Sequence, residues 1–367
     1  MNNNFDLVYM QKALDLAVQA KGRTSPNPMV GAVVVKDAQI IGEGYHQKAG
    51  TPHAEVIALR AAGEKAKGAT LYVNLEPCSH YGRTPPCADT VIDAGIKRVV
   101  IACFDPNPLV AGQGIKILQK AGIETTVGIL QEQALKLNEA FFKYIQTGIP
   151  FLSLKVAMTL DGKIATSKGD SRWISSKSSR QYVHQLRNTY DAIMVGIGTV
   201  LKDNPMLNTR LNSNDTRDPI RVIIDSKLDL PLQSNIVMTA KAQQTIVFCS
   251  QDADSQLKTI LKAKNIEVIP VECADGNIIP LEEVLKILGK KGIVSLLVEG
   301  GGEINGYLIT KGLINKIYWF IAPKIVGGRK SPTPVGGIGI PTLKEALSVK
   351  SMEITHFDDD ILITGYL

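Results

Sequence analysis

Several features that mark other classes of protein are scarce in this chain of 367 residues. Aromatic residues make up 5%, and no apolar run reaches the length of about 18 residues needed to cross a bilayer. The first residues lack the basic region and apolar core of a secretory signal. The five cysteines, an odd number, fit a reducing compartment in which thiols can bind metal. The sequence therefore predicts a cytoplasmic protein with no membrane segment.

The positive charges are too scattered to indicate a nucleic-acid interface. The net charge is +6, but no basic cluster with interleaved aromatic residues occurs. Anionic small molecules that carry phosphates explain such a balance equally well. We therefore expect no nucleic-acid partner.

The chain does contain metal-ligating residues in a characteristic order: His53-Ala-Glu55, then Pro77-Cys78, then Cys87. His53, Cys78 and Cys87 would bind one zinc ion and leave its fourth position to water, as in catalytic zinc sites. Zinc lowers the pKa of such a water to about 7. Glu55 lies near the start of a predicted helix and could carry the proton without binding the metal. This pattern is typical of nucleobase deaminases.

A simpler interpretation makes Cys78 and Cys87 unrelated buried thiols and His53 a surface residue. The order and spacing of the histidine, the glutamate and the two cysteines argue against it. The remaining residues of these kinds have no motif. We interpret them as packing or structural residues: Cys103, Cys249, Cys273, His184, Trp319 and His356.

Strand and helix patterns alternate along both halves, which predicts an α/β fold with helices on both faces of each sheet. At this length two domains are expected. A helical pattern at 131–145 is followed by Gln146-Thr-Gly-Ile-Pro150, which breaks it and predicts domains at 1–147 and 148–367. His53 and Cys87 fall at helix N-termini, where the helix dipole favours a thiolate. In the second half, strands are expected at 192–195, 221–224, 245–248, 267–271, 295–298 and 316–321.

The second half also has a glycine-rich turn, Glu299-Gly-Gly-Gly-Glu-Ile-Asn-Gly306. A strand that runs through glycines into a helix exposes backbone N–H groups that can hold a phosphate. The spacing does not match the dinucleotide G-x-G-x-x-G pattern, so a plain tight turn is an alternative. Arg187 and Arg210 could each bind a phosphate through a forked guanidinium, or be surface charges.

Longer stretches are similar to one family. Glu76-Pro-Cys-Ser-His-Tyr-Gly-Arg-Thr-Pro-Pro-Cys87, with eight residues between its cysteines, and Ser25-Pro-Asn-Pro-Met-Val-Gly-Ala32 closely resemble the bifunctional deaminase-reductases of riboflavin biosynthesis. Residues 155–165, 171–173 and 196–205 and the glycine turn resemble the reductase half of that family. The resemblance implies a cytidine-deaminase-like three-layer domain followed by a dihydrofolate-reductase-like domain.

The resemblance also implies partners and contacts. The substrate would be a pyrimidine carrying a ribose phosphate, the cofactors one Zn²⁺ and NADPH, and the assembly a homo-oligomer. The deaminase substrate contacts would be Asn27, His80 and Arg83. The NADPH contacts would be Ala157, Trp173, Thr199, Asp203, Ser226, Gly301, Gly302, Glu303, Ile304, Asn305, Gly306 and Tyr307. The reductase substrate contacts would be Lys155, Ser171, Arg187, Leu207, Arg210 and Glu299. On the residues alone, Trp173 could be a core residue and Asp203 could only begin a turn.

Two other functions are consistent with parts of this pattern. One is a deaminase of free or polynucleotide bases whose C-terminal half only forms oligomers. The other is a zinc-stabilised binding protein without turnover, which would unfold when the metal is removed.

Overall fold

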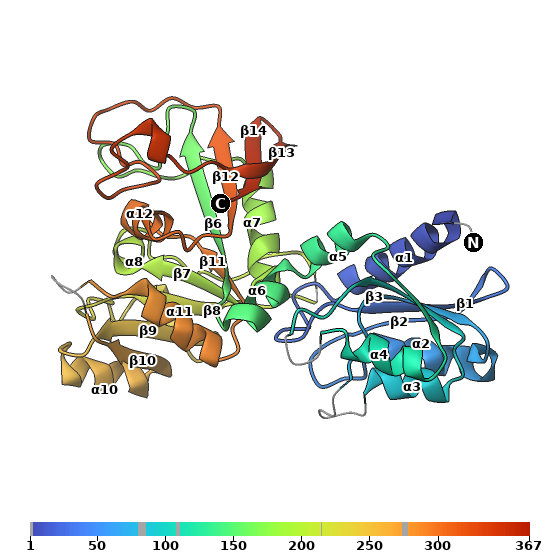
Figure 1. Ribbon diagram of the computed structural model, residues 1–367. Helices are drawn as coiled ribbons and strands as arrows, with labels where there is room; N and C mark the ends of the chain where they lie inside the picture. Colours follow the sequence, from blue (N-terminus) through green and yellow to red (C-terminus); the bar gives the residue numbers. More distant parts are fainter. Residues whose placement is uncertain (1–2, 80–85, 108–110, 214, 274–277) are drawn as a thin grey trace. The chain divides into compact units, whose positions relative to one another are not determined.

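The computed structural model describes residues 3–79, 86–107, 111–213, 215–273 and 278–367. It divides into two compact units, Met1–Gly148 and Ile149–Leu367 (Figure 1). The sequence placed the boundary between residues 147 and 148. None of the helices that these residues form is both long and apolar enough to span a membrane.

The first unit is built on a five-stranded sheet with the order β2-β1-β3-β4-β5. The central strand β3 pairs antiparallel with β1 and parallel with β4. The carboxyl ends of β3, β4 and β5 therefore meet at one edge, where Pro77-Cys78 follows β3. The strands are β1 Gly31–Lys36, β2 Gln39–Tyr45, β3 Thr70–Leu75, β4 Arg98–Cys103 and β5 Glu124–Val127.

Helices cover both faces of this sheet. Figure 1 shows α1 and α5 on one face and α2, α3 and α4 on the other, which confirms the three-layer fold expected for the first half. The helices are α1 Asn3–Val18, α2 Ala54–Ala62, α3 Cys87–Asp93, α4 Gln113–Lys120, α5 Gln131–Leu137 and α6 Glu139–Thr147, with a short 3-10 helix at Gly63–Ala66.

Two glycines allow helices to pack closely on the sheet. A Cβ atom at Gly31 would lie 2.1 Å from the carbonyl oxygen of Ala13 on α1. A Cβ atom at Gly42 would lie 2.2 Å from the carbonyl oxygen of Ala58 on α2. No side chain fits at these distances, so glycine at 42 holds α2, and with it Glu55, close against β2.

The single helix expected at 131–145 is wrong, because the structure divides it into α5 and α6 at Asn138. The backbone there leaves helical geometry, with φ −106°. The Asn138 side chain accepts the Met29 N–H at 2.8 Å and donates to the Met29 carbonyl at 2.9 Å. This long-range bonding satisfies a buried amide and competes with the continuation of the helix.

The second unit contains a nine-stranded sheet in the order β10-β9-β8-β7-β11-β6-β12-β14-β13. The strands from β10 to β12 are parallel, and β14 and β13 are antiparallel additions. The six strands expected in this half after residue 190 are confirmed, but the last two were not predicted. The bounds are β6 Phe151–Thr159, β7 Ala192–Gly196, β8 Ile220–Ile224, β9 Thr245–Ser250, β10 Ile266–Val271, β11 Ser295–Val298, β12 Lys316–Ala322, β13 Lys350–Phe357 and β14 Asp360–Tyr366.

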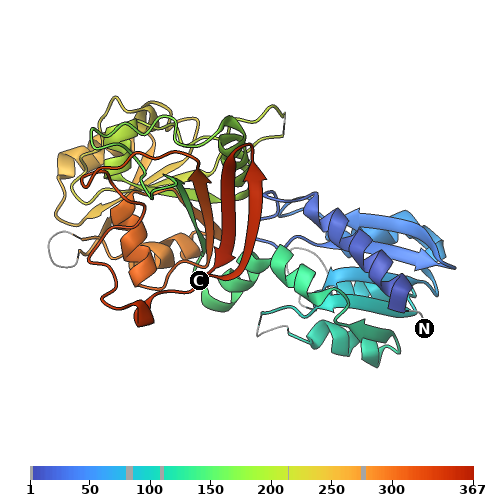
Figure 2. The same cartoon turned by 90° about the horizontal axis from the view of Figure 1, so that it is seen from above.

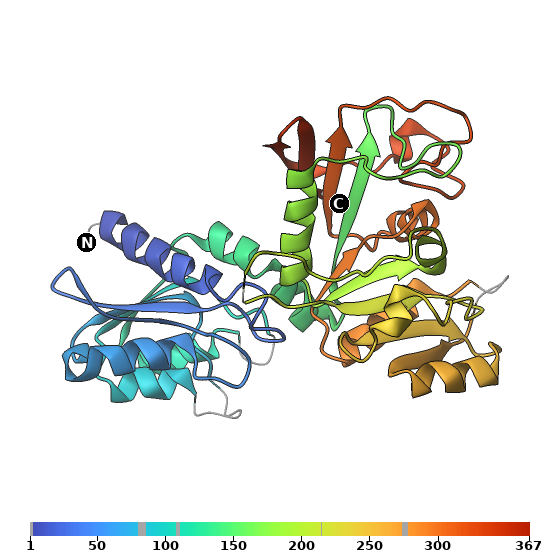
Figure 3. The ribbon, with the colours of Figure 1, turned by 180° about the vertical axis from the view of Figure 1, so that it is seen from behind.

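Figure 2 shows β12, β14 and β13 side by side as the red strands near the C-terminus. The reverse view in Figure 3 shows α7 beside this part of the sheet. A buried cluster that includes Leu186, Tyr190 and Phe320 joins the helix to the strands. The helices are α7 Lys177–Thr189, α8 Ile197–Asp203, α9 Asn235–Met238, α10 Ser255–Ala263, α11 Leu281–Lys290 and α12 Gly302–Thr310, with a 3-10 turn at Leu343–Glu345.

Candidate active sites

The predicted zinc ligands meet at one point of the first unit. His53 is the N-cap of α2, Cys87 is the first residue of α3, and Cys78 follows β3. The Nδ1 atom of His53 lies 3.1 Å from Cys87 Sγ and 3.6 Å from Cys78 Sγ. All three possible ligand atoms lie within 4.8 Å of one another. Residues far apart in the sequence therefore form one compact donor set.

This donor set fits a zinc ion. A tetrahedral ion with bonds of about 2.0 Å to nitrogen and about 2.3 Å to sulfur separates nitrogen from sulfur by roughly 3.5 Å and the two sulfur atoms by roughly 3.8 Å, so small adjustments of these side chains would accommodate it. The backbone N–H of Cys87 donates to Cys78 Sγ at 3.2 Å. Hydrogen bonding with Cys87, and the nearby His53, lower the pKa of the Cys78 thiol to about 4. These contacts stabilise the thiolate form of Cys78, whereas hydrogen bonding with Cys78, and burial, raise the pKa of Cys87.

Glu55 is buried beside these ligands, with 3% of its surface exposed. Burial, supported by the charge of Cys78, raises the pKa of Glu55 to about 7. Both protonation states are therefore accessible near neutral pH. A carboxyl group of this kind can first accept and then donate a proton.

A second histidine contributes to this region, and sequence reasoning missed it. The buried ring of His46 lies edge-on to the ring of His53, with centroids 5.4 Å apart. Its Nδ1–H donates to the Pro52 carbonyl at 3.2 Å, and Asn27 Nδ2 donates to its Nε2 at 3.1 Å. The Asn27 amide is thus oriented by a ring next to the metal ligands. His46 has no motif, so only the tertiary contact reveals it. The other two expected deaminase contacts, His80 and Arg83, lie outside the described residues.

Glu76 binds backbone groups between the end of β4 and the start of α4. It is 4% exposed, and its carboxylate accepts backbone N–H groups from Asp105 at 3.2 Å, Gly112 at 2.9 Å and Ile115 at 3.3 Å. Glu76 directly precedes Pro77-Cys78, so the position of a metal ligand is tied to the start of α4.

The second unit has a cavity of about 890 Å³. Strands β6, β7 and β11 end at it, and the turn from β11 into α12 contributes glycines to its wall. The expected contacts that line it are Lys155, Ala157, Ser171, Trp173, Arg187, Thr199, Asp203, Leu207, Arg210, Glu299, Gly301, Gly302, Glu303, Ile304 and Asn305. The structure therefore gathers these residues in one space, and Trp173, 61% exposed, is not a core residue.

Three of the expected cofactor contacts do not line this cavity. Gly306 faces the chain at Gly336 instead, since a Cβ atom there would lie 2.4 Å from the Gly336 carbonyl oxygen. Tyr307 donates to Glu282 at 2.7 Å on α11. Ser226 accepts the Ser250 N–H through its carbonyl at 2.9 Å. Gly306 and Tyr307 follow the glycine turn in sequence, but they lie further along α12, at positions that do not face the cavity.

A buried carboxylate organises the charges in the cavity. Glu299 binds Arg187 in a two-point contact of 2.8 and 3.0 Å, and Lys155 Nζ lies 3.1 Å from its Oε2. Burial alone would raise the pKa of Glu299, but the charges of Arg187 and Lys155 outweigh it and hold that pKa well below its usual range. The cavity wall carries six lysine and arginine side chains against three carboxylates. It therefore favours anionic ligands.

The glycine turn is suited to a close approach by a ligand. A Cβ atom at Gly301 would face the cavity, with Thr199 Oγ1 as its nearest neighbour at 3.9 Å. The buried Asn305 side chain donates to the Pro334 carbonyl at 2.8 Å, which fixes the segment beside the turn. The residues present thus fit a phosphate-bearing cofactor at the N-terminus of α12.

Comparisons with known proteins match both units. Residues 150–363 match the model of the RibD C-terminal domain, and residues 3–103 match that of the cytidine and deoxycytidylate deaminase zinc-binding region. The Riboflavin biosynthesis protein RibD of Aquifex aeolicus is 46% identical over 99% of this chain and 99% of its own length. That of Actinobacillus pleuropneumoniae is 45% identical over 98% and 94%.

Solved structures agree. Acinetobacter baumannii RibD is 39% identical, with a TM-score of 0.90, over 100% of this chain and 99% of its own. A Thermotoga maritima protein described as a diaminohydroxyphosphoribosylaminopyrimidine deaminase/5-amino-6-(5-phosphoribosylamino)uracil reductase is 38% identical, with a TM-score of 0.88, over 99% of both chains.

Proposed function

The chain belongs to the RibD family of bifunctional deaminases and reductases of riboflavin biosynthesis, and we propose that its two sites act in succession on one phosphorylated pyrimidine. The first substrate is 2,5-diamino-6-ribosylamino-4-pyrimidinone 5′-phosphate, which loses an amino group. The ribosyl group of the product is then reduced to ribityl. The observation that carries this proposal is the zinc donor set with Glu55 in one unit and the cationic, glycine-lined cavity in the other.

In the first site, His53, Cys78 and Cys87 hold the metal. When bound, zinc acidifies a water molecule and orients it for attack. The Glu55 carboxylate would accept the proton that the attacking water loses as its oxygen bonds to the ring carbon, and would return a proton to the departing amine as the carbon–nitrogen bond breaks. Asn27, oriented by His46, contacts the substrate. His80 and Arg83, which lie outside the described residues, complete the substrate contacts of our proposal.

When bound in the second site, NADPH would supply a hydride to the sugar carbon whose bond to the ring oxygen breaks. The N–H groups at the start of α12 and the glycines at 301 and 302 hold the cofactor phosphates. Lys155, held by Glu299 at the cavity wall, delivers the proton that the sugar oxygen needs after reduction. Ser171, Arg187, Leu207 and Arg210 position the rest of the substrate.

A coupled assay tests this sequence of reactions. Incubation of the phosphorylated diaminopyrimidinone with protein and zinc should release one ammonia per substrate, and NADPH oxidation should follow only after deamination. Zinc-dependent ammonia release without any NADPH oxidation would support instead a deaminase whose second unit serves only assembly.

Metal removal should separate the two activities. Dialysis against a chelator is expected to abolish ammonia release, because three of the metal's ligands come from the deaminase site. NADPH oxidation with already deaminated substrate should persist, because the cavity residues belong to the other unit. Added zinc should restore ammonia release. Loss of both activities together with loss of helical circular dichroism would indicate a metal needed for folding.

Two glycine variants should distinguish a cofactor contact from a packing contact. Gly301→Val places a side chain in the cavity, and we expect the KM for NADPH to rise about tenfold with the melting temperature unchanged. Gly306→Ala forces a methyl group against the Gly336 backbone, and we expect a melting temperature about 5 °C lower. Equal effects of both variants on the KM would contradict this assignment.

We propose that the protein forms a homo-oligomer through the edge strand β13. This strand has one neighbour in the sheet, and Met352 and Ile354 are 60% and 63% exposed. Exposed apolar edge strands pair readily with other chains. Light scattering should show an oligomer for the native protein and a smaller species for Ile354→Lys. A monomeric native protein would contradict the proposal.

We also propose a cytoplasmic location, because the two ligand cysteines must stay reduced. The cysteines of the described residues are free thiols. Fractionation of cells that produce the protein would test the location directly.

A further inference from the structure

We propose that His184 is a positioning residue that orients the Arg210 guanidinium toward the substrate phosphate in the reductase cavity. The proposal rests on the function proposed above, in which the substrate carries a phosphate. The sequence indicated no role for His184 beyond structure. Its side chain lines the cavity together with Arg210.

The helix α7 presents three polar side chains to this cavity. Arg180, His184 and Arg187 are spaced by four and three residues, so they lie on one face of the helix. Arg187 is engaged by Glu299, and the Arg180 guanidinium lies over the Trp173 ring at 4.4 Å. The two arginines of the helix therefore already have partners.

Arg210 reaches the cavity from the segment after α8. Glu299 is shared by Arg187 and Lys155. Among the residues that the structure describes, the guanidinium of Arg210 has one polar partner, the His184 ring, with Arg210 Nε 3.3 Å from His184 Nε2. An arginine that is not neutralised by a carboxylate keeps its forked donors available for an added anion.

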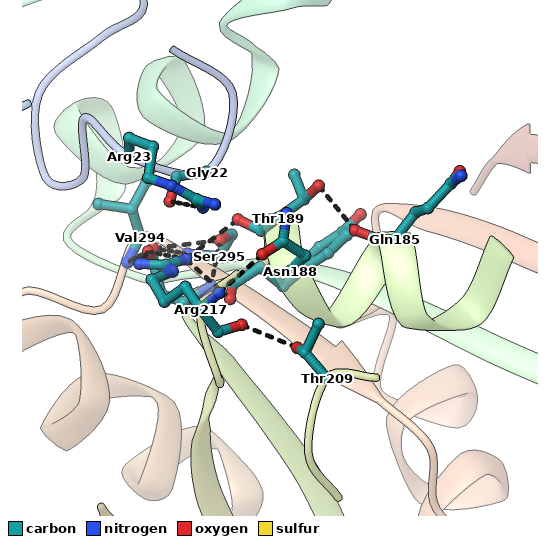
Figure 4. A network of polar contacts seen from close by, with 11 residues as sticks. Gly22, Arg23, Gln185, Asn188, Thr189, Thr209, Arg217, Val294 and Ser295 are labelled. Atoms are coloured by element: carbon teal, nitrogen blue, oxygen red, sulfur yellow. Dashed lines mark hydrogen bonds and ion pairs between the residues drawn. The ribbon is translucent and has the colours of Figure 1, made fainter. Parts of the chain in front are cut away.

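Contacts that do not involve His184 help to fix the backbone near Arg210. The N–H of Arg217 donates to the Asn188 side chain at 2.8 Å, and Thr209 Oγ1 donates to the Arg217 carbonyl at 2.8 Å (Figure 4). Arg217 also binds Asp191 at 3.3 Å. These contacts hold the segment against the end of α7 without the His184 ring, so loss of the ring should affect mainly the Arg210 side chain.

The chemistry of the ring determines which contact it makes. Burial, followed by the charges of Arg187 and Arg210, lowers the pKa of His184 to about 4, so the ring is neutral at neutral pH. A neutral ring has one N–H and one acceptor nitrogen. The Nε–H of Arg210 can only donate, so this contact requires Nε2 as the acceptor and places the ring N–H on Nδ1. The Nδ1 atom also lies 3.3 Å from the Arg210 backbone N–H, so the alternative tautomer would release the side chain.

Orientation of a long side chain before binding reduces the conformational entropy lost on binding. Removal of the acceptor should therefore weaken recognition of the phosphate and leave the chemical step unchanged. The expected signature is a change in KM without a change in kcat, restricted to substrates that carry the phosphate.

The test uses the full-length enzyme, saturating NADPH, and the deaminated substrate with and without its phosphate. For His184→Ala we expect the KM of the phosphorylated substrate to rise about tenfold, with kcat within about twofold and no change for the dephosphorylated substrate. His184→Gln places an oxygen where Nε2 lies and should restore most of the affinity. His184→Asn places its oxygen where Nδ1 lies and should resemble alanine. Gln185→Ala, at the exposed neighbouring position, is the matched control.

A double-mutant cycle with Arg210→Gln decides whether the two residues act together. We expect His184→Ala to have no further effect once Arg210 is replaced. Additive effects, or equal losses for both substrates, would overturn the proposal.

Calorimetric titration with ribose 5-phosphate provides a measurement that is independent of turnover. If the native enzyme reduced neither substrate, the proposed function would fail. Weaker binding of ribose 5-phosphate to His184→Ala than to Gln185→Ala would still support the His184–Arg210 pair, and equal binding would refute it.

Discussion

Replacement of Glu55 by glutamine should reduce ammonia release by roughly a thousandfold or more, which is the range for loss of a general acid–base group. Glutamine keeps the size of the side chain but can neither accept the proton of the attacking water nor return it to the leaving amine. Glu55 is buried next to the zinc donor set, and among the described residues that set itself contains no carboxyl group. Steady-state ammonia release, measured at equal zinc content, is the appropriate readout.

The controls for this variant address folding and specificity. Glu64→Gln alters an exposed carboxylate just after α2 and should leave ammonia release unchanged. NADPH oxidation with deaminated substrate should be normal in both variants, because that cavity lies in the other unit. If Glu55→Gln retained more than about a tenth of the native rate at full zinc occupancy, Glu55 would not be the proton carrier.

The largest effect on stability is expected for Arg221→Met, with a melting temperature of the second unit about 10 °C lower. Arg221 is fully buried on β8 and donates five hydrogen bonds, all of them to uncharged oxygens. Burial lowers its pKa to about 10. Methionine fills much of the volume but leaves these acceptor oxygens without a hydrogen bond. Each acceptor that water cannot reach costs about 1–3 kcal/mol of stability. Relief of the buried charge offsets part of this cost.

We therefore expect the free energy of unfolding to fall by about 3–5 kcal/mol. For a unit of this size, each kcal/mol lowers the melting temperature by roughly 2–4 °C. Differential scanning calorimetry should detect it. Lysine at 221 should not restore stability, because it lacks the planar fork of donors. Arg329→Met, at an exposed position, is the matched control. A change below about 1 °C for Arg221→Met would show that water or rearranged neighbours satisfy the acceptors.

The reductase activity should also depend on the hydrogen bonds of Arg221. Arg221 donates to the Met206 carbonyl at 3.4 Å, and Gln243 donates to the Leu207 carbonyl at 3.2 Å. These bonds hold the segment that places Leu207 in the cavity wall. A higher KM for the reductase substrate should therefore accompany the lower stability.

The sequence was most informative where local chemistry decides position. His53, Cys78 and Cys87 could be predicted as one site, because a metal imposes residue types and helix starts that a short motif preserves. His46 and Arg221 could not, because each acts through partners distant in the chain and neither lies in a recognisable pattern.

The errors in secondary structure have a similar origin. The periodicity at 131–145 is helical throughout, and only the bonding of Asn138 to Met29 interrupts it. β13 was not predicted because its residues are mostly exposed and give no buried alternation. Local patterns thus indicated parallel strands of the second sheet, whereas its antiparallel edge depends on tertiary contacts.

The Asn138 contact has a consequence for the smallest active deaminase. Similarity to the deaminase zinc-binding region ends at residue 103, well before Asn138. Asn138 binds the backbone of Met29, which is two residues from the proposed substrate contact Asn27. A fragment ending at residue 103 would contain all three metal ligands. It would lack the Asn138 contact that supports the chain beside Asn27. Such a fragment could bind zinc while recognising the pyrimidine poorly. The functional unit therefore extends at least through the junction of α5 and α6.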